Sequence, residues 1–146
     1  NREKGPKKLN SLFTTVTAEA ARTLIIFSGL VCIPDSPEAY TAKQDLFEFI
    51  KEMPVGKWDE SSILHAKMDG FISVHADGGT LDITLDFLKE NKNYKITYYE
   101  DAEDTDSKTN PEAYQVRTAI VKKGDIVKAK MVAGGGHCMW IRPDNT

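Results

Sequence analysis

Short runs of alternating apolar and polar residues fill residues 94–143, and they constrain the fold more than any other feature of the chain. A period of two residues is that of a β-strand buried on one face and hydrated on the other. Turns are predicted at Lys123-Gly124-Asp125 and at Gly134-Gly135-Gly136, which leads into a last strand with Trp140 and Ile141. This part of the chain is therefore predicted to be a small antiparallel β-sandwich. Its expected apolar faces are Tyr94, Ile96 and Tyr98, then Tyr114, Val116, Thr118 and Ile120, then Val127, Ala129 and Met131, with Lys122, Lys123, Lys128 and Lys130 turned outward.

Upstream, apolar residues recur at helical spacing before and after one short apolar run. We expect a helix over residues 14–27, a buried strand at residues 30–33, and a second helix over residues 38–53 that ends at Pro54. The apolar positions are Val16, Ala20, Leu24 and Phe27 in the first helix, and Ala39, Ala42, Leu46, Phe49, Ile50 and Met53 in the second.

Beyond Pro54 the pattern changes to strands alone, beginning with residues 71–76 and 80–85. This shift indicates a domain boundary, so we divide the chain into residues 1–54 and 55–146. One helix-strand-helix unit cannot form a parallel sheet by itself, since its single strand has no neighbour. Because the chain also starts at Asn1 without an initiator methionine, we interpret it as part of a longer polypeptide.

Composition argues against two classes of partner. The formal net charge is -3 with both signs interspersed, so a nucleic-acid-binding surface is not expected. No apolar run approaches the roughly 20 residues of a membrane-spanning helix. Cys32 and Cys138 lie far apart in sequence, and we expect either two buried thiols or, if the fold brings them together, a disulfide.

Several motifs, in matching order and spacing over nearly the whole chain, resemble the closing segment of glycoside hydrolase family 97. They lie at residues 17–24, 27–30, 33–40, 47–51, 58–60, 85–88, 98–101, 109–114 and 134–136. Members of this family have an N-terminal β-sandwich, a central (β/α)8 barrel and a C-terminal β domain. The resemblance implies an α+β chain, in which residues 1–54 are the last helix-strand-helix elements of the barrel and residues 55–146 the antiparallel C-terminal β domain.

The family also implies an activity. Its members hydrolyse α-glucosides with inversion or α-galactosides with retention, with two carboxyl groups at the anomeric carbon and a calcium ion nearby. In the family these carboxylates and the calcium ligands come from earlier barrel loops, so we expect neither catalytic residues nor a metal site on this chain. The resemblance further implies an oligosaccharide substrate bound by the parent barrel, an upstream part of the same polypeptide as partner, and a periplasmic or secreted location.

One departure from the family pattern lies between Val74 and Gly79. A further strand-turn-strand is expected there, but the chain passes directly from His75-Ala76 to Asp77-Gly78-Gly79. If a hairpin is deleted, the sandwich loses one or two strands, and the pairing of its edge is in question.

Asp35 is the candidate substrate-binding residue. It follows the apolar run at residues 30–33, and the C-terminal ends of barrel strands are where substrates bind. The alternative is that Asp35 only caps the following helix, since Asp is a preferred N-cap residue.

Other constellations are weak. Residues 100–106 are rich in acidic side chains, but they lack EF-hand spacing and are predicted to be a solvated loop. His65, His75 and His137 have no metal-ligand spacing, and His137 and Cys138 should point to opposite faces of a strand. Trp58, Trp140, Tyr98 and Tyr99 are interpreted either as core packing or as a sugar-stacking platform.

Two functions remain open. The first is the C-terminal part of an α-glycoside hydrolase, which closes and supports the barrel and is inactive alone. It predicts bare apolar faces on Leu24, Phe27, Leu46 and Phe49, where the rest of the barrel would pack. The second is a free-standing, non-catalytic carbohydrate-binding β-sandwich, which predicts exposed Trp140 or Tyr98.

Overall fold

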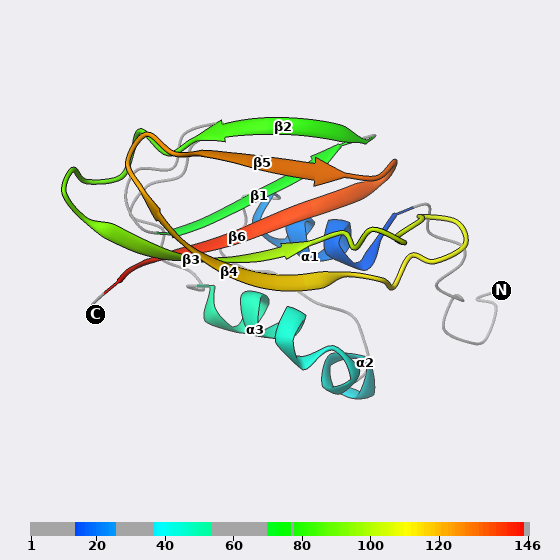
Figure 1. Ribbon diagram of the computed structural model, residues 1–146. Helices are drawn as coiled ribbons and strands as arrows, with labels where there is room; N and C mark the ends of the chain where they lie inside the picture. The colour runs from blue at the N-terminus through cyan, green and yellow to red at the C-terminus, as the bar shows by residue number, and fades with distance from the viewer. Residues whose placement is uncertain (1–13, 26–36, 54–69, 77, 145–146) are drawn as a thin grey trace, which may run out of the picture.

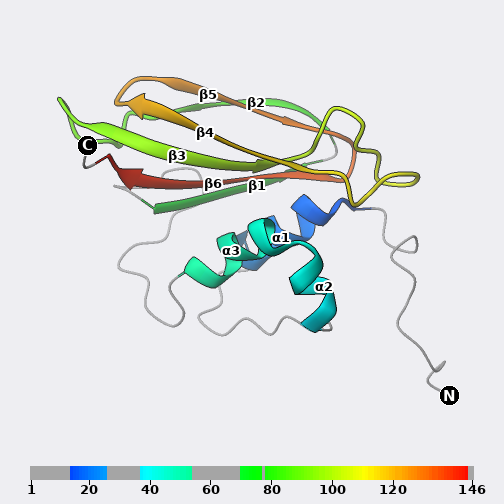
Figure 2. The same cartoon turned by 60° about the horizontal axis from the view of Figure 1, so that its bottom comes forward.

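The computed structural model describes residues 14–25, 37–53, 70–76 and 78–144. Three layers are stacked: a two-stranded sheet, a four-stranded sheet, and helices on the outer face of the larger sheet (Figures 1 and 2). The helices are α1 (Val16–Ile25), α2 (Pro37–Ala42) and α3 (Gln44–Glu52). The strands are β1 (Gly70–Ala76), β2 (Gly79–Thr84), β3 (Asn93–Glu100), β4 (Gln115–Lys122), β5 (Ile126–Met131) and β6 (Gly135–Pro143).

All strand pairs are antiparallel, in the orders β1-β6-β3-β4 and β2-β5. The predicted antiparallel β domain is therefore confirmed, and the last strand, β6, lies inside the larger sheet. The inner faces of the two sheets share one apolar core, because alternate side chains of each strand point the same way. Its buried members are Leu85, Leu88, Tyr94, Ile96, Tyr98, Val121, Val127, Met139 and Ile141.

The expected apolar face of β4 is wrong. Val116 and Ile120 are 37% and 56% exposed, and Val121 is the buried residue of the strand. Register explains the difference: Tyr98 lies opposite Arg117 and Tyr94 opposite Val121, so the odd-numbered residues of β4 share the core-facing side. The even-numbered residues lie on the side of the sheet where the helices pack.

Between β1 and β2 the chain changes sheets without an intervening hairpin. β1 ends at Ala76 and β2 begins at Gly79. Gly78 and Gly79 have φ values of 102° and 108°, a region that residues with a Cβ rarely adopt. β1 is nevertheless paired with β6 along its whole length, so the shorter connection leaves the larger sheet intact.

A second apolar cluster joins the helices to the larger sheet. It contains Ala20 and Ala21 of α1, Leu46, Phe49 and Met53 of the α3 segment, and Tyr99 and Cys138 of the sheet. The prediction of bare faces on Leu46 and Phe49 is therefore wrong, because both side chains are buried against the chain's own β-sheet. Leu24 is half-buried, and Phe27 lies outside the described residues.

The helix predictions are confirmed with two changes of boundary. α1 occupies the middle of the first predicted helix, whereas the second is divided into α2 and α3 at Lys43. The predicted strand at residues 30–33 and the boundary at residues 54 and 55 lie outside the described residues. Within the described ranges, no helix is long and apolar enough to span a membrane.

Candidate functional site

The candidate substrate residue, Asp35, lies outside the described residues, as do Trp58 and His65. Asp35 thus stays a prediction, both as a substrate contact and as a helix cap. The buried charged side chains of the described part, Glu100 and Asp101, lie elsewhere, at the end of β3, and each gathers polar partners from other elements. They form two groups on opposite faces of the larger sheet.

The first group lies where α1 contacts β6. A Cβ atom on Gly136 would lie 2.5 Å from the Cα of Ala18, so the helix rests directly on the strand backbone. A side chain on Gly135 would collide with the Asp101 carboxylate. Gly134, with a φ of 72°, makes the turn that brings both glycines under the helix. The triple glycine therefore allows α1 to pack closely on β6, and it also forms the predicted tight turn before that strand.

Asp101 joins the two elements by hydrogen bonds. Its carboxylate accepts bonds from Thr15 Oγ1 (2.8 Å), Val132 N (3.1 Å) and Gly136 N (3.2 Å). Thr15 Oγ1 in turn accepts a bond from Ala18 N at 3.1 Å, the N-cap arrangement for α1. Burial raises the pKa of Asp101, and the hydrogen bonds from Thr15, Val132 and Gly136 oppose that rise.

The backbone at the start of α1 is also held by the β domain. Thr15 N donates to Gly134 O at 3.0 Å, and Val16 N donates to Pro111 O at 2.8 Å. N–H groups at a helix start have no partner within the helix, so here the sheet loops supply the acceptors. We call this set the α1–β6 contact; it comprises Thr15, Val16, Ala18, Asp101, Gly134, Gly135 and Gly136.

The second group, the Glu100 cluster, lies inside the sandwich and consists of Glu100, Gln115, Arg117 and His137. Glu100, only 6% exposed, accepts hydrogen bonds from Gln115 Nε2 (3.0 Å) and from Arg117 Nε (2.5 Å) and an Arg117 terminal nitrogen (3.2 Å). The Arg117 guanidinium also lies over the Tyr98 ring, 3.6 Å from its centroid. A buried carboxylate is thereby neutralised by a paired arginine.

His137 is the unusual member of the Glu100 cluster. Its side chain is 0% exposed, and Nδ1 lies 3.3 Å from Glu100 Oε2, yet neither ring nitrogen forms a hydrogen bond to the described protein. Burial lowers the pKa of His137 to about 4, although Glu100 favours the charged form. The imidazole is therefore neutral at pH 7.

The neighbouring Cys138 points to the opposite face of β6, as predicted, and lies in the cluster beneath the helices. Burial raises the pKa of its thiol to about 12. A thiol with that pKa is not a nucleophile near neutral pH, so residues 137 and 138 do not form a nucleophile and base pair.

Comparison with known protein families identifies the family of the β domain described above. A family model described as "Glycosyl-hydrolase 97 C-terminal, oligomerisation" matches residues 57–142.

The chain belongs to the glycosyl-hydrolase 97 C-terminal family.

Solved structures of longer relatives contain the same fold. The chain is similar to a Glycoside Hydrolase Family 97 enzyme from Pseudoalteromonas sp. strain K8, seen in one structure in complex with acarbose and in another, of a variant, with panose. In both comparisons the TM-score is 0.78 and the identity 24%, and the match covers 90% of this chain. It covers 23% of the relative, so this chain spans about a quarter of that enzyme's length. The resemblance to the C-terminal part of family 97 is confirmed.

The described acidic residues of this glycosyl-hydrolase 97 C-terminal chain do not fit the calcium ion that the family implies. The described residues contain no group of three or more His, Cys, Asp or Glu that could hold a metal ion. In the acidic loop, Asp101 is engaged by α1, Asp104 accepts from Asn110, and Asp106 accepts from the backbone of Lys108 and Thr109. These carboxylates are already bound by protein donors.

The prediction of a solvated acidic loop is wrong at its start. Glu100 and Asp101 are 6% and 8% exposed, because their partners come from distant parts of the chain. Thr15 was recognisable from sequence as a residue type that caps helices, whereas no local signal identifies its partner 86 residues away.

In the described part, Tyr98 and Tyr99 of this C-terminal domain are packed in the core and do not form the alternative, a sugar-stacking platform. Tyr98 and Tyr99 are buried on opposite sides of the sheet. Trp140 is half-buried, and the Arg142 guanidinium lies 3.8 Å from its ring centroid. A sugar would have to displace that arginine to stack on the same ring face.

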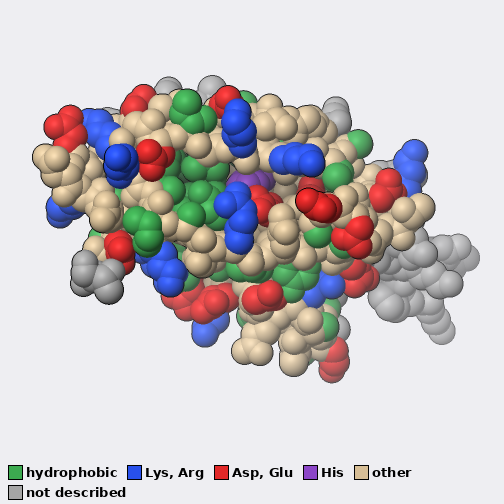
Figure 3. Space-filling model, viewed as in Figure 1, with side chains coloured by type: hydrophobic (Ala, Val, Ile, Leu, Met, Phe, Trp, Pro, Cys, Tyr) green, Lys and Arg blue, Asp and Glu red, His purple; other side chains and the backbone are tan. Residues whose placement is uncertain are grey.

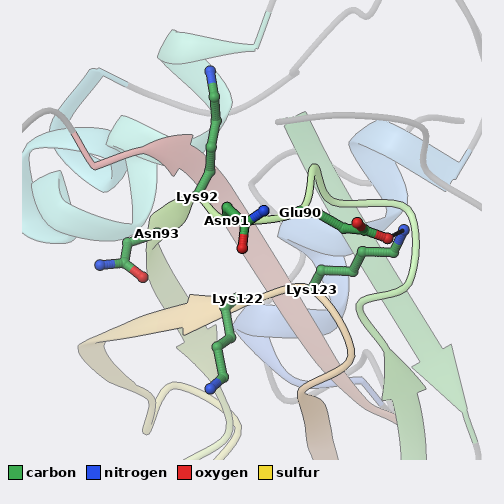
Figure 4. A pocket seen from close by; sticks show the side chains of 6 residues that line it. All are labelled: Glu90, Asn91, Lys92, Asn93, Lys122 and Lys123. Atoms are coloured by element: carbon green, nitrogen blue, oxygen red, sulfur yellow. Dashed lines mark hydrogen bonds and ion pairs between the residues drawn. The ribbon is translucent and has the colours of Figure 1, made fainter.

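Two hollows lie on the described surface, and the smaller is lined by charged and aromatic side chains, among them Asp45, Glu48, Trp140 and Arg142. The larger, of about 460 Å³, lies beside Asn91, where Glu90 pairs with Lys123 while Lys92 and Lys122 point away from each other (Figure 4). A second, of about 260 Å³, lies between α3 and the sheet. Charges of both signs are mixed over the face shown in Figure 3, in keeping with the sequence.

Proposed function

We propose that this chain is the non-catalytic C-terminal portion of a glycoside hydrolase acting on α-glucosides or α-galactosides. In this proposal the catalytic carboxylates and the calcium ligands are supplied by the upstream part of the polypeptide, and oligosaccharide binds there. In this proposal the chain supports the catalytic part. It also brings copies of the enzyme together, since the family description names oligomerisation. A periplasmic or secreted location belongs to the same proposal.

The observation that carries the proposal is the α1–β6 contact. By resemblance, α1 belongs to the end of the barrel, and its first turn is held by Asp101 and by two backbone acceptors of the β domain. The contact leaves no room for a side chain at positions 135 and 136, and both positions are glycine. Because α1 is held against the β domain in this way, the β domain can fix the orientation of the catalytic part to which α1 would belong. A supporting domain requires such a fixed contact.

The test compares this 146-residue chain with the intact protein that contains it. Both are assayed on aryl α-glucoside and aryl α-galactoside with calcium present. We expect turnover by the intact protein and none by the chain alone. Turnover by the chain, lost on Asp35→Ala substitution, would contradict the proposal, because a catalytic site would then reach into these residues.

A further inference from the structure

We propose that the free edge of strand β4 is the surface through which two copies of this chain associate. The two β4 strands pair antiparallel about a two-fold axis at Thr118, and the larger sheet continues from one copy into the other. This inference rests on the proposed function, of which self-association is one part. It adds the surface, the strand register and the residue on the axis.

β4 is an end strand of the larger sheet. β3 pairs with it on one side, and no described strand pairs with it on the other (Figures 1 and 2). Each residue from Gln115 to Lys122 has a partner in β3, so the strand contains no bulge, and it contains neither proline nor glycine. A regular edge of this kind presents unpaired N–H and C=O groups to another strand.

The only charged side chain within residues 115–121 is turned away from the edge. Arg117 is bound by Glu100 and lies over the Tyr98 ring, so its charge is held over the chain's own sheet. Charges that project from an edge strand are a common protection against strand addition. Apart from the half-exposed Arg117, β4 carries an exposed charge only at its last residue, Lys122, while it exposes Val116 and Ile120 nearer its middle.

The other edges are less suited to strand addition. β5 carries the exposed Lys128 and Lys130 on alternate positions, and β2 carries the exposed Asp82. β1 forms the opposite end of the larger sheet. Its side chains at Ile72, Ser73 and Val74 are half-buried, so this edge is less open to a second strand than β4.

The occupant of the edge is a second copy because the side chains of β4 complement themselves. With the axis at Thr118, this residue faces Thr118 of the second copy, and Val116 faces Ile120. Pairs of β-branched residues and Thr–Thr pairs are favourable across antiparallel strands. On the other face Arg117 faces Ala119, so no like charges meet.

Neighbouring registers lack this complementarity. An axis at Arg117 would place two guanidinium groups opposite each other, which is unfavourable for a cross-strand pair. An axis at Ala119 would place Lys122 opposite Val116. Charge and side-chain shape therefore select Thr118.

The test uses the intact protein that contains this chain, as wild type and as the variants Thr118→Asp and Thr118→Cys. Thr80→Asp and Thr80→Cys are matched controls, because Thr80 is also an exposed threonine, on β2. Mass is measured by sedimentation velocity, and cross-linking by non-reducing electrophoresis after treatment with diamide. Wild type reports any cross-link from the native cysteines, and circular dichroism checks folding.

We expect wild type to self-associate and Thr118→Asp to weaken association at least about tenfold, since two carboxylates would meet at the axis. Thr118→Cys should form a covalent dimer, because directly opposed Cβ atoms lie close to disulfide distance. The Thr80 variants should behave as wild type.

Two results would overturn the inference, and they differ in what else they overturn. If wild type associates but neither Thr118 variant changes mass or cross-links, the interface lies elsewhere, and self-association itself stands. A monomeric wild type would remove both the β4 interface and the self-association part of the proposed function, but would leave the glycosidase assay unaffected.

Discussion

At the scale of residues, two adjacent carboxylates have different roles because they point to opposite faces of one sheet. Glu100 is buried in the sandwich with Arg117 and His137, whereas Asp101 binds Thr15 at the start of α1. Each accepts hydrogen bonds from protein donors, at 2.5 to 3.2 Å for Glu100 and at 2.8 to 3.2 Å for Asp101. Both carboxylates therefore have a structural role, and replacing one carboxylate oxygen by an amide nitrogen should lower the stability of the fold.

Asp101→Asn is expected to destabilise the chain by about 1–3 kcal/mol, the usual effect of leaving buried polar groups unsatisfied. The amide of asparagine would turn an N–H donor toward Thr15 or toward the N–H groups of Val132 and Gly136. The measurement is the free energy of unfolding in urea. Asp82→Asn, at an exposed position, is the control and should cost little. Equal losses for the two variants would contradict this role of Asp101.

His137 predicts a pH dependence of stability. Its pKa is about 4 in the folded chain and near 6.5 when unfolded, so between these values the unfolded state binds more protons. Its contribution to stability is therefore complete above pH 6.5 and is lost as the pH falls toward 4. A shift of this size corresponds to about 3 kcal/mol at most.

The variant His137→Phe should lack this dependence. It should be at least as stable as wild type at pH 7, because it removes two buried nitrogens that have no hydrogen bond within the described structure. Urea unfolding of both proteins at pH 7, 6, 5 and 4.5 measures the difference. If the two stability curves stay parallel over this range, the histidine is not buried in its neutral form.

At the scale of elements, α1 and β6 fit together because glycine leaves room for the helix. Gly136→Val would push a side chain into the α1 backbone at Ala18. We expect a loss of about 3 kcal/mol, at the upper end for overpacking, since the obstructing atoms are backbone atoms that cannot rotate away. Ala133→Val adds bulk at a nearby exposed position and should have little effect. Thermal unfolding measures both, and equal melting temperatures for wild type and Gly136→Val would contradict the close contact.

The strands differ in how well their buried residues could be predicted from the sequence. Alternation correctly predicted the buried residues of β5 and the sandwich-facing Tyr94, Ile96 and Tyr98 of β3, but it missed that Thr97 and Tyr99 are buried on the other face of β3. It failed for β4, where Val116 and Ile120 lie outside the sandwich core and only the register with β3 decides which face is buried. The contacts of Asp101 and Glu100 could not be predicted either, since they join residues far apart in sequence. Asp35 remains untested.

At the scale of the whole molecule, the helices and the larger sheet share an apolar cluster. Phe49 is buried there, with its ring centroid 5.3 Å from that of Tyr99. A shared core couples the unfolding of the parts that build it, so residues on both sides of position 54 should unfold in one transition.

Phe49→Ala tests this coupling. The substitution should cost about 3–5 kcal/mol, as for other buried aromatic residues. Helix content by circular dichroism and the fluorescence of the two tryptophans, Trp58 and Trp140, should then lose their native values together, at a lower urea concentration. Phe47→Ala, at a half-buried position, is the control. Separate transitions for the two signals would instead support independent domains divided near residue 54.

The position of β6 determines the order in which the described chain can assemble. Of the described strands it is the last in the sequence, yet it pairs with both β1 and β3 and carries the backbone on which α1 rests. Contacts between residues so distant in sequence form late, after the intervening loop has closed. During synthesis α1 must therefore remain undocked until β6 has been made, and its apolar side is exposed until then.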